Sequence, residues 1–168
     1  MSLRLILIRH AKSNWDDPFA DDHARVLNAR GRRAARAVGR WMDARGYLPD
    51  LVLSSDSART RETADRLMAE WTRPARVRFL PRLYHADPDT LLEVLQDAQG
   101  DTVALIAHNP GIGAFASTMV AQRPEHARFA DYPTCATTLI DFDTAHWADI
   151  RPGAGRVVAF VTPHDLSD

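Results

Sequence analysis

The 168-residue chain is predicted to fold as an α/β protein, a three-layer α/β/α sandwich with a mainly parallel central sheet. Short and almost wholly apolar runs, which are typical of buried strands, alternate with longer segments of helical periodicity. No internal repeat, linker or low-complexity segment interrupts this alternation. The length suits one unit with a substantial core, so residues 1–168 are expected to form a single domain.

Apolar runs bounded by polar, Gly or Pro residues give the strands in order. Strands are predicted over residues 3–8, 51–54, 77–80, 102–107, 137–142 and 157–162. Asn28 is the predicted N-cap of the first helix, which runs to about Arg45 and stops at Gly46. Ser57 is the predicted cap of the second helix. Two further helices are expected over residues 89–98 and 110–121.

The first helix carries a basic face opposite its apolar one, formed by Arg32, Arg33, Arg36 and Arg40. Such a face is ordinarily a solvated surface. The alternative is a docking face for an acidic phosphoprotein, which would make binding sensitive to salt.

Composition narrows the class of protein. The formal net charge of −1 gives no overall attraction to nucleic acid. Lys12 is the only lysine among the 21 basic residues, and the others are arginines. The single cysteine, Cys135, allows no intrachain disulfide and suggests a reducing compartment, so a cytoplasmic location is expected. The first apolar run is too short for a signal peptide or a membrane span, so no membrane association is expected.

Arginine and histidine side chains gather where predicted strands end. Arg9 and His10 end the first strand, Arg59 lies in the first turn of the helix after the second, and His108 follows the fourth. The carboxyl ends of parallel strands share one crevice, so these residues are expected to converge there. Arginine forks bind phosphate oxygens, and neutral histidine can act as a nucleophile. The pattern indicates a site for a phosphoryl group.

Neighbouring residues fit the same interpretation. Ser13 and Asn14 can add neutral donors, and Asn109 is a plausible N-cap that leaves His108 beside a helix N-terminus, where anions bind. A cation in a first helical turn opposes the helix dipole, so Arg59 needs an anionic partner or a solvent-facing position.

These segments together resemble the histidine phosphatase superfamily, and within it the SixA-type phosphohistidine phosphatases. Arg9-His10 matches the family's Arg-His pair, and His108 lies in the family's His-Asn-Pro setting. Two further matches are a Ser-x-x-x-Arg-x-x-x-Thr segment and a Leu-Asn-x-x-Gly stretch before the first helix. Their members here are Ser55, Arg59 and Thr63, and Leu27, Asn28 and Gly31.

The resemblance implies a phosphatase in which neutral His10 attacks phosphorus and becomes a phosphohistidine intermediate. Arg9, Arg59 and His108 would hold the phosphoryl oxygens, with the arginines lowering the pKa of both histidines. No metal or cofactor is expected. The expected partner is a phosphohistidine-bearing protein or a small phosphate ester.

The general acid of many relatives has no clear counterpart. Family phosphoglycerate mutases and many acid phosphatases carry a proton-donating carboxylate after the third strand, where this chain has Tyr84 or His85. The candidates for an acid are therefore His85, Asp87 and, less favourably, Tyr84. A leaving group that takes its own proton from solvent, such as phosphohistidine, suits this departure.

Two functions of other classes stay open at this point. One is a phosphate-recognising binding module without turnover, which retention of both histidines disfavours. The other is a dinucleotide-binding oxidoreductase, because Gly111-x-Gly113-x-x-Ala116 fits the nucleotide fingerprint, although it lies on a late strand. A cysteine phosphatase is disfavoured, because Asp141 stands six residues after Cys135 where an arginine is needed.

Overall fold

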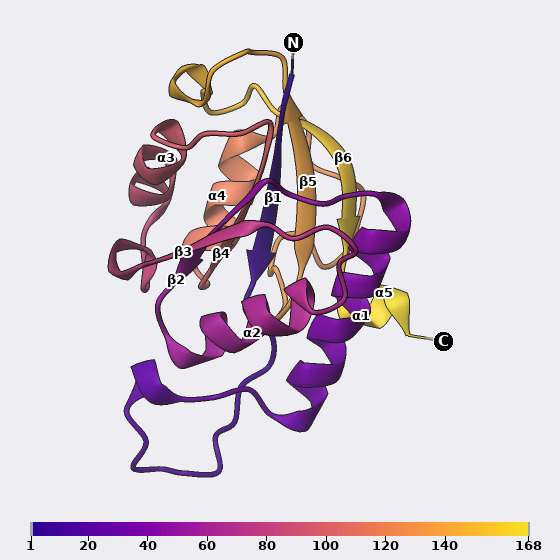
Figure 1. Cartoon of the computed structure of the whole chain (residues 1–168). Helices are drawn as coiled ribbons and strands as arrows, with labels where there is room; N and C mark the ends of the chain where they lie inside the picture. The colour runs from indigo at the N-terminus through magenta and orange to yellow at the C-terminus, as the bar shows by residue number, and fades with distance from the viewer. Residues whose placement is uncertain (1, 168) are drawn as a thin grey trace.

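The computed structural model describes residues 2–167 and contains a six-stranded sheet with the order β3-β2-β4-β1-β5-β6 (Figure 1). Strands β1, β2, β3 and β4 are all parallel to one another, whereas β5 runs antiparallel to its two neighbours, β1 and β6. The strands are β1 (Leu3–Arg9), β2 (Leu51–Ser55), β3 (Arg76–Leu80), β4 (Thr102–Ala107), β5 (Thr137–Phe142) and β6 (Arg156–Val161). The predicted mainly parallel α/β fold is confirmed.

Helices cover both faces of the sheet. On one face α1 packs against α2, and on the other α3 packs against α4 (Figure 1). The helices are α1 (Ala29–Arg45), α2 (Ala58–Met68), α3 (Pro88–Gln96), α4 (Gly111–Met119) and α5 (Pro163–Leu166). Three 3-10 turns are η1 (Asp22–Ala24), η2 (Pro81–Leu83) and η3 (Trp147–Asp149).

Alternation along β1 divides the core into two layers. Leu5 and Leu7 pack in the cluster that α3 and α4 cover, and Ile6 and Ile8 pack in the cluster that α1 and α2 cover. All four side chains are fully buried. A strand buried on both faces reads as a continuous apolar run, which is why this segment is predictable as a central strand.

Both predicted ends of α1 and the predicted start of α2 are confirmed. The Asn28 side chain accepts a hydrogen bond from the Gly31 amide at 2.8 Å, and the Ser57 hydroxyl accepts one from Thr60. Gly46 ends α1 in the left-handed conformation, with φ of 72°. The predicted bounds of α3 and α4 are wrong by one or two residues at each end, since α3 is Pro88–Gln96 and α4 is Gly111–Met119. Pro110, and not Asn109, occupies the N-cap position of α4.

Sheet register places the two histidines side by side. Arg9 pairs with Ala107 across β1 and β4, so His10 and His108 leave the sheet from adjacent positions. The long segment between β1 and α1 lies beyond this carboxyl edge (Figure 1). The start of α1 is packed on it: the Asn28 amide donates to the Lys12 carbonyl, and a Cβ on Gly31 would lie 2.0 Å from that oxygen. Glycine is therefore required at residue 31.

Candidate active site

A cavity of about 540 Å³ opens at the carboxyl ends of β1 and β4. Seven of the predicted site residues line it, namely Arg9, His10, Ser13, Arg59, His85, His108 and Asn109. Lys12, Trp15, Asp22, Arg25, Arg128 and Asp131 also contribute to its wall. Three predicted candidates, Asn14, Tyr84 and Asp87, are not among the lining residues. The cavity is the crevice expected for this type of sheet.

His10 is held in one tautomer by the backbone beside it. Its Nδ1 lies 2.7 Å from the carbonyl oxygen of Ala11, which can only accept, so Nδ1 carries the proton. Nε2 therefore has a free lone pair, toward which Arg59 Nε donates at 3.4 Å. Burial first, and then the positive charges of Arg59, Arg9 and Arg25, lower the pKa of His10 to about 3. The imidazole is neutral at neutral pH, and its unprotonated nitrogen meets the arginine.

Arg59 lies at the centre of the site. It is 2 % exposed, and its guanidinium donates to the ring nitrogens of His10 and His108. Nη1 donates to the backbone oxygen of Asp22 at 2.7 Å, and Nη2 contacts the Asp22 carboxylate at 3.1 Å. A buried cation in the first turn of α2 thus has the anionic partner that the helix dipole requires.

The second histidine has the opposite tautomer. His108 Nδ1 lies 3.3 Å from Arg59 Nη2, which can only donate, so Nε2 carries the proton and donates to the Ser55 hydroxyl at 2.8 Å. Burial, followed by His10 and Arg59, lowers the pKa of His108 to about 2. The two imidazole rings lie 5.3 Å apart. As expected from the sequence, the pKa of both histidines is lowered.

The spacing of Ser55, Arg59 and Thr63 has a structural reason. Ser55 ends β2 and accepts from His108, while Arg59 reaches both histidines from the first turn of α2. One turn later the buried Thr63 hydroxyl accepts from the Ala11 amide at 3.0 Å and donates to the Arg59 carbonyl at 2.7 Å. Thr63 therefore fixes Ala11, the residue whose carbonyl orients His10.

Arg9 reaches the cavity from the end of β1. Its Nη1 donates to the Tyr132 carbonyl at 3.1 Å, and its buried Nε has no hydrogen-bond partner within residues 2–167. Asn109 steadies the same segment by donating to the carbonyls of Asp131 and Tyr132. Its side-chain oxygen accepts from the Gly113 amide. The Asn109 side chain is thus engaged by backbone, and Arg9 brings a positive charge to the cavity wall.

Asp22 is a central residue that the sequence did not single out. Its carboxylate contacts Arg59 and Arg25, and it accepts hydrogen bonds from the Tyr84 hydroxyl and His85. Although partial burial opposes ionisation, these hydrogen bonds and charges hold the pKa of Asp22 far below its usual range. The available signal was the unmet need of Arg59 for an anion, together with a loop after His10 that contains Asp16, Asp17, Asp21 and Asp22.

The loop after His10 is shaped by Arg25. This nearly buried guanidinium donates to the Ser13 hydroxyl and stacks on the Trp15 ring at 3.6 Å. Ser13 thereby reaches the cavity wall together with Arg25. Asn14 serves a different purpose, because its side-chain oxygen accepts from the Asp16 amide in a local turn.

The structure separates the three candidate acids. Asp87 is the N-cap of α3, and bonding to Thr90 lowers the pKa of its carboxyl group. The Tyr84 hydroxyl donates to Asp22, and burial together with that carboxylate raises the pKa of Tyr84. His85 lines the cavity with its Nε2 3.0 Å from Asp22 and its ring 4.9 Å from that of His108. Of the three candidates, His85 is the one that lines the cavity.

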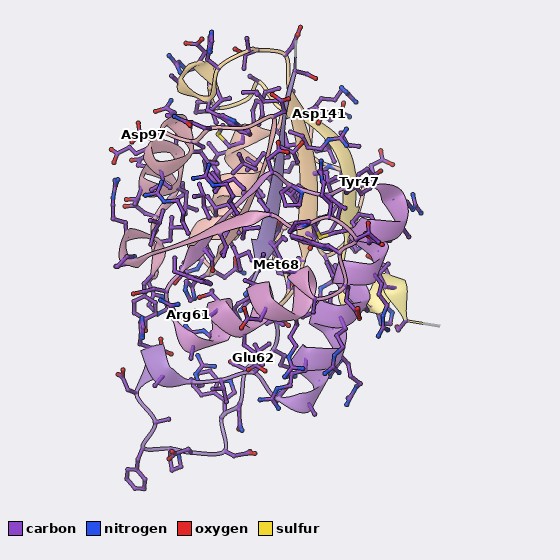
Figure 2. All side chains as sticks on the ribbon, in the orientation of Figure 1. Tyr47, Arg61, Glu62, Met68, Asp97 and Asp141 are labelled. Atoms are coloured by element: carbon purple, nitrogen blue, oxygen red, sulfur yellow. The ribbon has the colours of Figure 1, made fainter. Side chains whose placement is uncertain are left out.

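Other groups with possible functions are engaged elsewhere. Cys135 is fully buried, and burial raises the pKa of its thiol to about 12, which makes it a poor nucleophile. Half of the basic face of α1 is neutralised by α2: Arg32 contacts Glu62 at 2.5 Å, and Arg40 contacts Glu70 at 3.0 Å. Figure 2 shows Glu62 between α2 and the segment that leads into α1. These pairs favour the interpretation of that face as an ordinary solvated surface rather than a docking face.

Within residues 2–167, no cluster of three or more His, Cys, Asp or Glu side chains is arranged to hold a metal ion. In the same range, no helix is long and apolar enough to cross a membrane.

Comparison with known proteins identifies the family. The model of the histidine phosphatase superfamily (branch 1) matches residues 5–87, which include the Arg9-His10 pair and Arg59. A protein of Mycobacterium tuberculosis, itself without an assigned function, is 34 % identical over 164 residues that cover 93 % of this chain and 99 % of the relative.

Solved structures extend the likeness to nearly the whole chain. A structure from Agrobacterium tumefaciens described as a SixA phosphohistidine phosphatase has a TM-score of 0.82 and 28 % identity, covering 96 % of this chain and 98 % of the other. One from Nakamurella, described likewise, has a TM-score of 0.79 and 27 % identity, covering 97 % of both chains. The chain therefore belongs to the histidine phosphatase superfamily, is similar to SixA proteins over almost its whole length, and is a phosphatase.

Proposed function

We propose that the protein hydrolyses phosphohistidine on a protein substrate, without a metal, through a phosphohistidine intermediate on His10. The observation that carries this proposal is the state of the His10 ring. Nδ1 is bonded to the Ala11 carbonyl, Nε2 is unprotonated, and burial with three nearby arginines keeps the ring neutral. A neutral imidazole whose free nitrogen faces an arginine is prepared to attack an anionic phosphoryl group.

Attack by His10 Nε2 forms a nitrogen–phosphorus bond while the bond from phosphorus to the substrate imidazole breaks. The leaving imidazole takes a proton from solvent on its ring. Water then attacks phosphorus, releases inorganic phosphate and a proton, and restores neutral His10. Arg9 and Arg59, which both line the cavity, supply the positive charge that the three equatorial oxygens need.

His108 is proposed to bind the phosphoryl group from the second side. In the free site its Nδ1 accepts from Arg59 and its Nε2 proton is held by Ser55. A phosphoryl group that draws Arg59 to itself would leave Nδ1 facing an anion, which favours protonation of His108. In this proposal His108 is neutral in the free protein and becomes a donor when substrate is bound.

The side chains available as proton donors favour phosphohistidine over alkyl esters as the substrate. Asp22 is held ionised, Asp87 caps a helix, and the pKa of Tyr84 is raised, so none of them is suited to give a proton to an alkoxide at neutral pH. Phosphohistidine does not need that proton from the protein. His85 is the observation that favours the alternative, a small phosphomonoester phosphatase, because it lines the cavity beside Asp22.

The deciding experiment compares three substrates with wild-type protein and with His10→Ala. We expect rapid release of phosphate from a phosphohistidine protein, slower release from an aryl phosphate and very slow release from an alkyl phosphate. After rapid quenching, an acid-labile and base-stable label should be found on His10. Label on His108 instead would overturn the mechanism. Fast alkyl phosphate hydrolysis that is lost in His85→Gln would favour the ester phosphatase.

A further inference from the structure

The active-site cavity continues into a second one along the protein surface. The second cavity has a volume of about 230 Å³ and is lined in part by Lys12, Arg128, Pro133 and Thr134, all of which also line the first. It extends past Arg30 at the start of α1 to Pro163 and His164 of α5. The two cavities therefore adjoin each other, and we call them together the basic groove; its lining extends from His10 to His164 of α5.

The charge of the extension is positive. Arg128 is paired with Asp131 at 3.0 Å, so those two charges offset each other. Lys12 and Arg30 are exposed, and within residues 2–167 neither has an ion-pair partner. This distinguishes them from Arg32 and Arg40 of α1, which carboxylates of α2 neutralise. The extension thus offers uncompensated cations next to the phosphoryl site.

Lys12 is placed for this purpose by the same contacts that build the catalytic loop. Its carbonyl accepts from the Asn28 amide, and its backbone lies so close to Gly31 that any side chain at residue 31 would collide with it. The start of α1, which carries Arg30, is therefore fixed against Lys12. Backbone packing thus fixes the positions of Lys12 and Arg30 relative to each other. Lys12 lies two residues after the proposed nucleophile, His10.

We propose that the basic groove binds an acidic segment of the phosphoprotein substrate, adjacent to its phosphohistidine, through Lys12 and Arg30; this proposal rests on the function proposed above. A protein segment is favoured over a small bisphosphate by the form of the groove. Lys12, Arg30, Arg128 and His164 are all exposed, so the groove is open along its length. Sites for small molecules enclose most of their ligand, roughly 70–90 % of its surface.

The expected change in affinity follows from the exposure of both cations. An exposed ion pair contributes about 0.2–1 kcal/mol, so two of them should change affinity by about 2- to 30-fold and lose most of this effect at high salt. The test uses two phosphohistidine peptides that differ only in their flanking residues, glutamate in one and glutamine in the other. For wild-type protein at low salt we expect KM to be about fivefold lower for the glutamate peptide.

Variants then assign this preference to the groove. Lys12→Met should reduce the glutamate preference to about twofold, Lys12→Met with Arg30→Met should abolish it, and Lys12→Arg should restore it. The matched control is Arg45→Met, an exposed arginine at the far end of α1, which should keep the full preference. No preference in wild-type protein, or the same preference in the double variant, would overturn the proposal.

The same experiment separates this proposal from the proposed function. If neither peptide is dephosphorylated while an aryl phosphate is, the phosphohistidine function fails. The two peptides are then used as competitors of aryl phosphate hydrolysis. A lower Ki for the glutamate peptide that disappears in the double variant would still support the groove, and equal Ki values would overturn it.

Discussion

Replacing Arg59 with alanine should remove the centre of the proposed phosphoryl clamp. The side chain is buried and directs its donors at His10, at His108 and at Asp22. Loss of one preorganised donor costs about 10²–10³ in rate, or about 2.7–4 kcal/mol. Because Arg59 presents several donors at one point, we expect a loss of kcat/KM near the upper end, on the order of 10³.

The matched control is Arg61→Ala, two residues further along α2. Arg61 is exposed, donates to the Asp56 carbonyl at 2.9 Å and stacks on Phe79. It does not line the cavity, so its loss should change kcat/KM by less than about twofold. Figure 2 shows Arg61 on the outside of α2. Equal losses in the two variants would refute the assignment of the helix face.

Stability must be measured alongside activity. Arg59→Ala removes one cation from Asp22, but that carboxylate keeps Arg25, Tyr84 and His85 and is 42 % exposed. We expect a loss of about 1–2 kcal/mol in the free energy of unfolding, below the cost of breaking a fully buried pair. A domain of ordinary stability stays folded after that loss, so the fall in kcat/KM would report the chemistry. Urea unfolding checks this.

Further predictions follow from the same contacts. Thr63→Val should lower the free energy of unfolding by about 1–3 kcal/mol, because the Ala11 amide loses its acceptor. The same variant should lower kcat while changing KM little. An unchanged kcat would refute the positioning role. His10 and His108 have a folded pKa of about 3 and about 2, so the unfolded state binds more protons below pH 6.5. The free energy of unfolding should therefore be retained above pH 6.5 and fall by about 1 kcal/mol per histidine between pH 7 and 5.5. The double variant His10→Asn with His108→Asn should show a flatter pH dependence when its stability is measured by urea unfolding. Vanadate should compete with substrate, and EDTA should leave activity unchanged; loss in EDTA that Mg²⁺ or Zn²⁺ restores would refute the metal-free mechanism.

The fold was largely predictable because its signals are local. The run of β1 is apolar on both faces, as a central parallel strand must be, and Asn28, Ser57 and Gly46 mark helix ends by their own chemistry. Small errors occur at helix ends, where two candidate residues stand next to each other. Pro110 was expected to open α4, but it occupies the cap position instead.

The site was predictable where a residue is fixed by a strand end, and less so where a long loop folds back. His10 and His108 follow paired residues of β1 and β4, so strand order and register are sufficient to bring them together. Asp22 reaches Arg59 through a loop whose path depends on Arg25 and Trp15. The acceptor that fixes the His10 tautomer is the Ala11 carbonyl, a backbone atom that no sequence pattern marks.

Asp22 changes how the proposed chemistry should be understood. A carboxylate near a phosphoryl site could be taken for the missing general acid, but Arg59, Arg25, Tyr84 and His85 all stabilise its ionised form. An ionised Asp22 cannot protonate a leaving group; it holds Arg59 in place instead. Burial and, after it, the arginines keep His10 neutral, and the arginines offer positive charge to the incoming phosphoryl group. In the proposed mechanism one set of fixed charges thus prepares both the nucleophile and the anion site, and Asp22 gives the leaving group no proton, which leaves His85, the substrate or solvent as its source. That requirement is met most readily by a phosphoryl group carried on imidazole.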